Sequence, residues 1–219
     1  MISAQEALER LKEGNRRFVS EDWSTQTLPS GTRRREVAAG QQPFAIILGC
    51  SDSRVPAEMV FDQGLGELFV IRVAGNIVAP SQIGSVEFAA ERFGTRLVIV
   101  LGHSKCGAIQ ATVEELERPS GMRSPNLRSI VDRVRPSVEE LLQTDLRSNR
   151  EALLHHAGRA NIRASAAHLR HGSQTIEEMI ARNGLLVVGA EYSLETGIVD
   201  FFDEWDSPPV GSKTEFTNR

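Results

Sequence analysis

The stretch "FAIILGCSDSR" (residues 44–54) decides the fold, because an apolar run ends abruptly in a cysteine, two serines, an aspartate and an arginine. The stretch "LVIVLGHSKCG" (97–107) repeats this form and ends in a histidine and the second cysteine of the chain. Continuous apolar runs are typical of parallel strands buried on both faces, and sites form beyond the carboxyl ends of such strands where the strand order reverses. The two stretches therefore predict neighbouring strands whose ends bring reactive side chains together.

Further apolar runs complete the predicted sheet. Residues 68–73 ("LFVIRV") and 185–190 ("LLVVGA") have strand character, and 198–202 ("IVDFF") predicts an edge strand after the turn signal "ETG". Helical patterns lie between the runs, at residues 80–94, 106–117, 126–143 and 150–183. This alternation predicts an α/β fold with a mainly parallel central sheet flanked by helices.

The chain is expected to form a single domain over residues 1–205 with an N-terminal helical arm over about 3–40. Residues 3–19 predict an amphipathic helix in which Ser3 and Glu6 form a capping box, and a short basic helix is expected around 32–39. Residues 118–125 ("RPSGMRSP") predict a surface loop. The tail 206–219 contains proline and glycine and few apolar groups, so we expect it to be disordered or to pack on a partner.

Composition excludes several classes of protein. The net charge of −4 over 219 residues gives no general attraction to nucleic acid or to an anionic membrane. No apolar run approaches 18 residues, and the N-terminus lacks the apolar centre of a signal peptide, so the expected location is the cytoplasm. Two cysteines are too few for a disulfide framework, and the cytosol keeps thiols reduced.

The strand ends carry a candidate metal site. If the two strands are neighbours, Cys50, His103 and Cys106 converge, and two thiolates with one imidazole suit Zn²⁺. Three protein ligands would leave the fourth tetrahedral position open to water, as in catalytic zinc sites. Asp52 is the candidate fourth ligand, and Arg54 is close enough in sequence to hold its carboxylate away from the metal. The alternatives are two buried thiols that act as small apolar groups and a salt bridge within a loop.

Other polar groups are less informative. The remaining histidines lie in a helical region and are interpreted as surface or packing residues; they are His155, His156, His168 and His171. The glycine-rich stretch 64–76 matches neither a dinucleotide fingerprint nor a P-loop, so no nucleotide site is predicted there.

Four segments together resemble the β-class carbonic anhydrases of bacterial type: "CSDSRVPAE" (50–58), "GELFVIRVAGN" (66–76), "GSVEFA" (84–89) and "GHSKCGA" (102–108). In order and spacing the resemblance covers roughly residues 5–203. It implies one Zn²⁺ per chain on Cys50, His103 and Cys106, and the reversible hydration of carbon dioxide to bicarbonate and a proton by zinc-bound hydroxide. The chain would then be a carbonate dehydratase, a zinc lyase. The resemblance gives catalytic roles to Asp52, which would orient the hydroxide, and to Arg54, which would keep Asp52 ionised and off the metal.

The resemblance also implies an assembly and a substrate pocket. The family forms homodimers in which the N-terminal arm lies across the partner, and dimers often pair into homotetramers. The matching pocket residues are Gln41, which is donated across the dimer interface, and Phe69, Ala74, Gly75, Phe88 and Gly107.

Some bacterial members carry a regulatory bicarbonate site built from a tryptophan, an arginine and a tyrosine. Arg72 and Tyr192 match two of these positions, but Ile47 stands at the tryptophan position and argues against that site.

Three other functions are weighed against the hydration of carbon dioxide. The same scaffold and zinc ligands serve relatives that hydrolyse carbonyl sulfide or carbon disulfide, and the motifs do not separate the two activities. A non-catalytic structural zinc protein would hold Asp52 on the metal as a fourth ligand. A thiol redox protein is disfavoured because the chain has no C-x-x-C motif.

Overall fold

The computed structural model describes residues 2–24, 30–119 and 124–203. The tail expected at 206–219 and part of the loop expected at 118–125 lie outside these residues. The described residues form a five-stranded sheet in the order β2-β1-β3-β4-β5. The strands are β1 (Ala45–Gly49), β2 (Leu68–Arg72), β3 (Leu97–His103), β4 (Leu186–Tyr192) and β5 (Val199–Asp203). The first four are parallel, and β5 pairs with β4 in the antiparallel sense.

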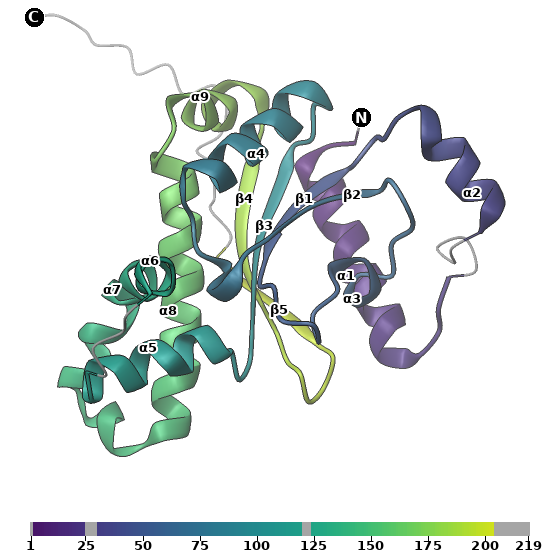
Figure 1. Cartoon of the computed structure of the whole chain (residues 1–219). Coiled ribbons are helices and arrows are strands. Elements are labelled where there is room, and N and C mark those ends of the chain that lie inside the picture. Colours follow the sequence, from purple (N-terminus) through teal and green to yellow (C-terminus); the bar gives the residue numbers. More distant parts are fainter. Residues whose placement is uncertain (1, 25–29, 120–123, 204–219) are drawn as a thin grey trace, which may run out of the picture.

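Helices cover both faces of the sheet and confirm the predicted α/β fold (Figure 1). The α-helices are α1 (Ala4–Ser20), α2 (Gly31–Glu36), α3 (Ala57–Val60), α4 (Pro80–Arg92), α5 (Gly107–Glu117), α6 (Pro125–Val134), α7 (Pro136–Glu139), α8 (Arg150–His171) and α9 (Gln174–Asn183). The 3₁₀ turns are η1 (Val37–Ala39), η2 (Ala74–Asn76), η3 (Leu141–Gln143) and η4 (Asp145–Ser148).

The apolar runs of β1, β3 and β4 are continuous because these three strands are buried on both sides. Ile47, Ile99 and Val188 pack into one apolar cluster with α1 and α3. Their neighbours along the strands, such as Ile46 and Val98, pack into a second cluster with α4, α8 and α9. Alternate side chains of one strand thus enter two different cores, so no polar face interrupts the pattern.

Two stretches with a continuous helical pattern are interrupted in the structure. Over 126–143, α6 ends at Val134 and α7 starts with Pro136 at its first turn, because proline has no N–H with which to continue the helical ladder. Over 150–183, α8 ends at Gly172 and Ser173 caps α9 by accepting a hydrogen bond from Ile176 N. Cys106 is likewise the N-cap of α5 rather than part of the helix.

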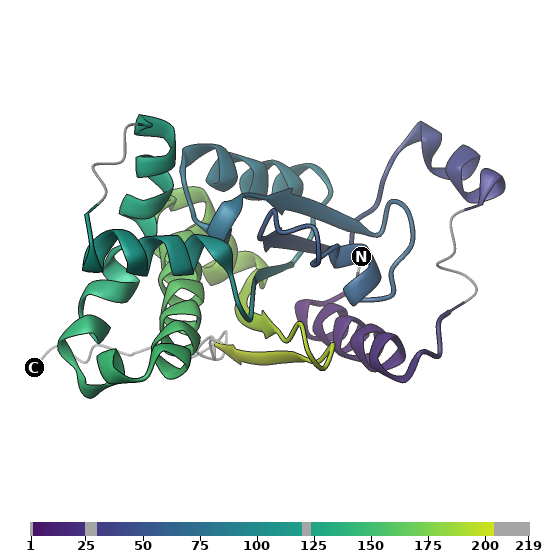
Figure 2. The same cartoon turned by 60° about the horizontal axis from the view of Figure 1, so that its bottom comes forward.

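The N-terminal arm divides into two parts. Helix α1 has the predicted capping box and buries Ala7, Leu8 and Leu11 against the sheet of its own chain. Helix α2 has no buried residue and stands away from the body in both views (Figures 1 and 2). The arm's packing on a partner therefore stays a prediction, and α2 is the segment left uncovered in the single chain.

Strand order reverses between β1 and β3, because the chain passes from β1 to β2 on one side and reaches β3 on the other. These two strands are directly paired, with Gly49 opposite Leu101. Their carboxyl ends therefore share one edge of the sheet, where α/β folds place their sites. Within the described ranges, no helix is both long and apolar enough to cross a membrane.

Candidate metal centre

The reversal point brings together the three predicted metal ligands. Cys50 directly follows β1, His103 is the last residue of β3, and Cys106 caps α5. One ligand atom from each lies within 4.8 Å of the others, and all three residues are buried. Tetrahedral zinc with Zn–S of about 2.3 Å and Zn–N of about 2.0 Å separates its donor atoms by roughly 3.5–3.8 Å. Small adjustments of side-chain position would therefore seat one such ion.

The histidine has the tautomer that a metal ligand needs. Nδ1 of His103 lies 2.8 Å from the carbonyl oxygen of Ser104, so Nδ1 carries the proton and donates it. The lone pair is then on Nε2, which is buried without any hydrogen-bond partner. Buried polar atoms are rarely left in that state, because an unpaired nitrogen in a dry site costs about 1–3 kcal/mol. A cation bound at Nε2 would satisfy this nitrogen.

Electrostatics within the cluster also favour a cation. A hydrogen bond from the Cys106 thiol lowers the pKa of Cys50, and the same contact raises the pKa of Cys106. Without an ion the pair therefore holds one negative charge, because two thiolates at this distance repel each other. Burial acts to lower the pKa of His103, but the Cys50 thiolate outweighs burial and the net pKa is raised. A divalent cation would replace the shared proton and satisfy all three donors.

The turn between His103 and Cys106 is held by the β4–β5 connection. Ser104 N donates to the carbonyl oxygen of Tyr192 at 2.9 Å, and Ser104 Oγ accepts from Leu194 N at 3.0 Å. Lys105 has a φ of 55°, which an L-residue adopts only when the surrounding structure imposes it. This tight turn is what lets residues three apart present their ligand atoms to one point.

Asp52 lies beside the cluster but outside it. Its Oδ2 is 3.8 Å from His103 Nε2, yet Asp52 does not belong to the set of atoms mutually within 4.8 Å. Arg54 donates to both carboxylate oxygens, and its backbone N–H donates to Oδ1 at 3.0 Å. These hydrogen bonds from Arg54 hold the pKa of Asp52 well below its usual range. Asp52 is therefore an ionised acceptor turned toward Arg54.

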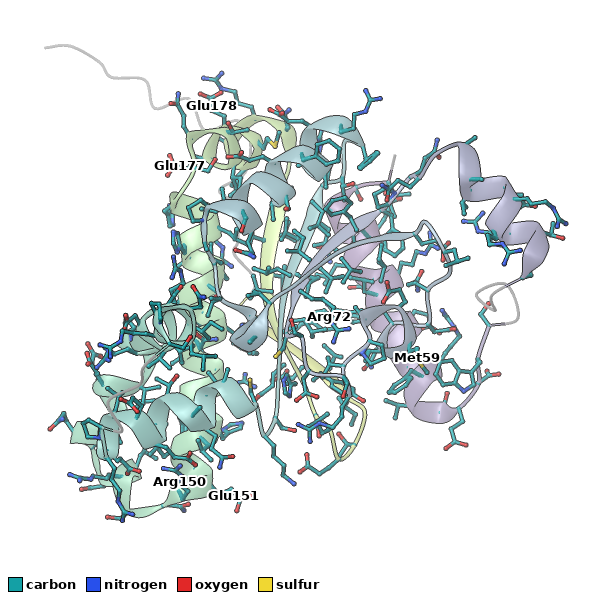
Figure 3. All side chains as sticks on the ribbon, viewed as in Figure 1. Met59, Arg72, Arg150, Glu151, Glu177 and Glu178 are labelled. Atoms are coloured by element: carbon teal, nitrogen blue, oxygen red, sulfur yellow. The ribbon has the colours of Figure 1, made fainter. Side chains whose placement is uncertain are left out.

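Arg72, at the end of β2, fixes the loop that carries Cys50 and Asp52. Its Nε donates to the carbonyl oxygen of Cys50 at 2.9 Å, and its Nη2 donates to that of Asp52 at 2.5 Å. Figure 3 shows Arg72 near the centre of the molecule, where the strands end. This role of Arg72 was not predicted from the sequence, although a charged residue at the end of an apolar strand is a signal for it.

The other two positions that correspond to the regulatory bicarbonate site of some bacterial members, a site that Ile47 argues against here, are buried. Ile47 is fully buried in the core beneath α1, and Tyr192 is 6% exposed in the same cluster. Burial raises the pKa of the Tyr192 hydroxyl.

The predicted pocket residues fall into two groups within one chain. Ala74, Gly75 and Gly107 lie at the metal centre: Gly75 N donates to Cys50 Sγ at 3.4 Å, and Gly107 begins α5 directly after Cys106. A Cβ at Gly107 would meet no atom within 4 Å, so open space adjoins the ligand there.

Gln41, Phe69 and Phe88 lie at the opposite end of the sheet. Gln41 lines a groove of about 500 Å³ together with Phe93, next to the start of β1. The rings of Phe69 and Phe88 pack on Phe93 at 6.1 and 5.7 Å. Phe69 pairs with Ile46, four residues before Cys50, which places it about 13 Å along the strand from the metal ligands. The single chain thus does not unite these residues with the metal centre.

Comparison with known proteins gives consistent matches over most of the chain. A family model described as carbonic anhydrase matches residues 45–199. Carbonic anhydrase 2 of Mycobacterium tuberculosis H37Rv is 38% identical over 196 residues, which cover 87% of this chain and 89% of the relative. The carbonic anhydrase of Mycolicibacterium smegmatis is 37% identical over 199 residues, with 89% and 91% covered.

Solved structures show the same fold. The β-carbonic anhydrase CcaA superposes with a TM-score of 0.68 at 26% identity, covering 91% of this chain and 92% of that one. The β-carbonic anhydrase CafA of Aspergillus fumigatus gives a TM-score of 0.70 at 24% identity, with 91% and 90% covered.

Proposed function

Because this chain belongs to the carbonic anhydrase family, with the β-class fold, we propose that it catalyses the reversible hydration of carbon dioxide on a zinc ion. The ligands of that ion are Cys50, His103 and Cys106. The observation that carries the proposal is His103 Nε2, a buried and unpaired nitrogen placed beside two thiol sulfurs at the switch point of the sheet.

Zinc at this site would supply an acidified water as the nucleophile and a fixed place for it. The two thiolates would cancel the formal charge of the ion, whereas a site with three neutral histidines keeps the full +2 and brings its water to a pKa near 7. The surroundings of this site must therefore offset the charge of the sulfurs. The Gly75 N–H on Cys50 Sγ does so by drawing electron density from one thiolate.

Asp52 supplies the acceptor for the nucleophilic water. Its carboxylate stays ionised because Arg54 lowers its pKa, so Asp52 accepts a hydrogen bond and cannot donate one. If the O–H of the nucleophilic water donates a hydrogen bond to Asp52, a lone pair of its oxygen points toward carbon dioxide. Arg54 holds both carboxylate oxygens and so restrains Asp52 from taking the fourth position on the metal.

The separation of the pocket residues supports a homodimer with shared pockets. Gln41, Phe69 and Phe88 gather at one end of the sheet and the metal ligands at the other. In a homodimer, the end of one protomer that carries the metal ligands would face the end of the other protomer that carries Gln41, Phe69 and Phe88. Two pockets would then form, each with the metal centre of one chain and the aromatic cluster of the other. Carbon dioxide is small and apolar, and these aromatic side chains suit it.

Two further assignments extend the proposal. A solved relative from Sordaria macrospora is described as tetrameric, which supports pairing of such dimers here. Two cysteines that serve as metal ligands must stay reduced, so the cytoplasm is the compartment that fits.

The proposal is tested by measuring zinc content and carbon dioxide hydration on one purified sample, with carbonyl sulfide hydrolysis assayed beside it. We expect one zinc per chain and hydration that far exceeds carbonyl sulfide turnover. Full zinc occupancy without hydration would make the metal structural, and preferential turnover of carbonyl sulfide would assign the other activity of this scaffold.

A further inference from the structure

Asn161 lies in the middle of helix α8 and is 1% exposed. It lies behind the candidate metal ligands and does not itself belong to that set. Its Nδ2 donates to the carbonyl oxygen of Gly75 at 2.8 Å. The N–H of the same Gly75 donates to Cys50 Sγ at 3.4 Å. The backbone of Gly75 thus links Asn161, which lies 86 positions away in sequence, to the sulfur of Cys50.

We propose that Asn161 is a positioning residue for the metal centre, which holds the Gly75 amide against the Cys50 sulfur. The inference rests on the proposed function, because it gives Asn161 a role toward the bound zinc.

Gly75 needs such a hold because glycine has no side chain that restricts its backbone to one conformation. Gly75 has φ 71° and ψ 18°, and Asn76 after it has φ 43°, so two consecutive residues occupy the left-handed region. Asparagine tolerates that region better than most L-residues, and for glycine it is one of several accessible conformations. A carbonyl fixed by Asn161 on one side and an N–H directed at sulfur on the other define both dihedral angles of Gly75.

Side chains of α5 and α6 also pack closely against the Cα of Gly75. A Cβ on Gly75 would lie 3.1 Å from Ala108 Cβ and 3.5 Å from Val134. Ala108 is the second residue of α5, directly after the Cys106 cap and Gly107. The Gly75 backbone is therefore confined between the two cysteine ligands and α8.

Helix α8 is itself seated against the other half of the site. Gly102 precedes the ligand His103, and a Cβ on Gly102 would meet Ile162 at 2.5 Å. Ile162 follows Asn161, so glycine at position 102 is what allows this turn of α8 to reach the end of β3. Asn161 thus lies on the turn of α8 that packs against the end of β3, next to Ile162.

Asparagine is an unfavourable residue at the buried position 161 unless its hydrogen bond to Gly75 has a role. Asparagine is a poorer helix former than alanine, and burying its amide costs free energy unless it is hydrogen-bonded. Most of the neighbouring buried positions on α8 are apolar, namely Ala157, Ile162 and Ala166, and Ser165 is the polar exception one turn further along. An apolar residue at 161 would suit the helix better, so the hydrogen bond to Gly75 is the feature that favours asparagine.

The chemical effect follows from the N–H···S contact. A hydrogen bond to a thiolate lowers the energy of the sulfur lone pairs and weakens their donation to the metal. Loss of Asn161 would let Gly75 turn away and would leave Cys50 a stronger donor in a less well fixed position. Residues that orient metal ligands in this way typically change metal affinity by about 10- to 100-fold when mutated.

The test compares the wild-type holoenzyme with Asn161→Leu, which removes the polar group, and Asn161→Asp, which keeps the shape and loses the donor. Ser165→Ala is the matched control, because Ser165 is also buried on α8 and lies one turn further along. Each protein is measured for the rate of zinc transfer to a chromogenic chelator and, after cobalt substitution, for its sulfur-to-cobalt charge-transfer band. Thermal unfolding of the metal-free proteins reports on the fold.

We expect the Asn161 variants to transfer zinc about 10- to 100-fold faster and to shift the charge-transfer band to longer wavelength, while Ser165→Ala matches wild type. Wild-type rates and bands in a folded Asn161→Leu or Asn161→Asp protein would overturn the inference. So would failure of both variants to fold, since the contact would then serve the fold and not the site. A wild-type protein without bound zinc would instead refute the proposed function itself.

Discussion

Arg54 donates to the two oxygens of Asp52 separately, from Nε to Oδ1 at 2.9 Å and from Nη2 to Oδ2 at 2.7 Å. A bidentate pair of this kind fixes the plane of the carboxylate as well as its charge. The carboxylate is thereby kept near His103, at 3.8 Å from Nε2, without joining the metal ligands. We propose that this ion pair keeps the fourth coordination position of the bound ion open for water.

Asp52→Asn tests the catalytic role of the carboxylate. The amide of asparagine has only one acceptor oxygen, whereas the carboxylate of Asp52 has two. The amide is also neutral, so the ion pair with Arg54 is lost. We expect kcat for hydration to fall by about 100-fold or more, in line with the loss of one aligned hydrogen-bond partner at a reacting centre. Zinc content, measured on the same protein, is expected to stay at the wild-type value. Loss of the metal would mean that Asp52 is a ligand.

Arg54→Gln tests the restraint on Asp52. Without the guanidinium, Asp52 is free to turn toward the cation, so we expect zinc to be retained and hydration to drop by at least about 10-fold. The cobalt-substituted variant should show a spectrum of a closed site with four protein ligands. Arg182→Gln, on the exposed face of α9, is the control for loss of one surface arginine and should behave as wild type. An Arg54→Gln enzyme with normal turnover would contradict the restraint.

The pH dependence of hydration follows from the direction of the Asp52 shift. Its pKa is lowered by Arg54, so the folded-state interaction is complete above the ordinary value of about 3.9 and is lost only as pH falls below it. Asp52 is therefore ionised throughout the range in which the enzyme is assayed. We expect a stopped-flow profile that rises with pH and has its midpoint near 7 or above, set by the acidified water. A midpoint near 4, or a flat profile, would contradict this assignment.

Gly102→Ala tests the seating of α8 against the end of β3. The added methyl group would meet the Ile162 side chain at 2.5 Å, so that side chain, the strand end or the helix must shift. We expect a loss of about 1–3 kcal/mol in the free energy of unfolding, as for other overpacked cores, together with weaker zinc binding.

Gly158→Ala is the matched control within α8, because a Cβ there would make only an ordinary contact of 3.8 Å with Glu191. Alanine in a helix interior should stabilise that variant by roughly 0.5–1 kcal/mol. Chemical denaturation of the three proteins checks both values, and equal stability of Gly102→Ala and wild type would show that the contact is easily relieved.

The convergence of Cys50, His103 and Cys106 could be predicted because the position of each depends on a local signal and one topological rule. Both apolar runs are buried on two faces, so their lengths mark the strands, and reactive residues directly after them fall at the carboxyl edge. The adjacency of β1 and β3 then follows from the reversal of strand order in such sheets.

The remaining features depend on contacts between distant segments. Arg72 holds two carbonyl groups of the loop that contains Cys50, which no pattern near Arg72 specifies. Asn161 looks like one polar residue on a helix, and only the packing of α8 shows that it faces Gly75. The location of Gln41 and Phe88 away from Cys50, His103 and Cys106 likewise depends on the sheet register and on the position of α4.

The central claim is that one ion on Cys50, His103 and Cys106 supports hydration, and zinc titration of the metal-free enzyme tests it most directly. Metal-free protein is prepared with a chelator, zinc is added stepwise, and carbon dioxide hydration is followed by stopped flow at each step. We expect activity to rise in proportion to added zinc and to level off at one equivalent per chain, and we expect Cys106→Ser neither to retain the ion nor to gain activity. Full activity in the metal-free protein, or in Cys106→Ser, would show that hydration does not depend on an ion at these three residues.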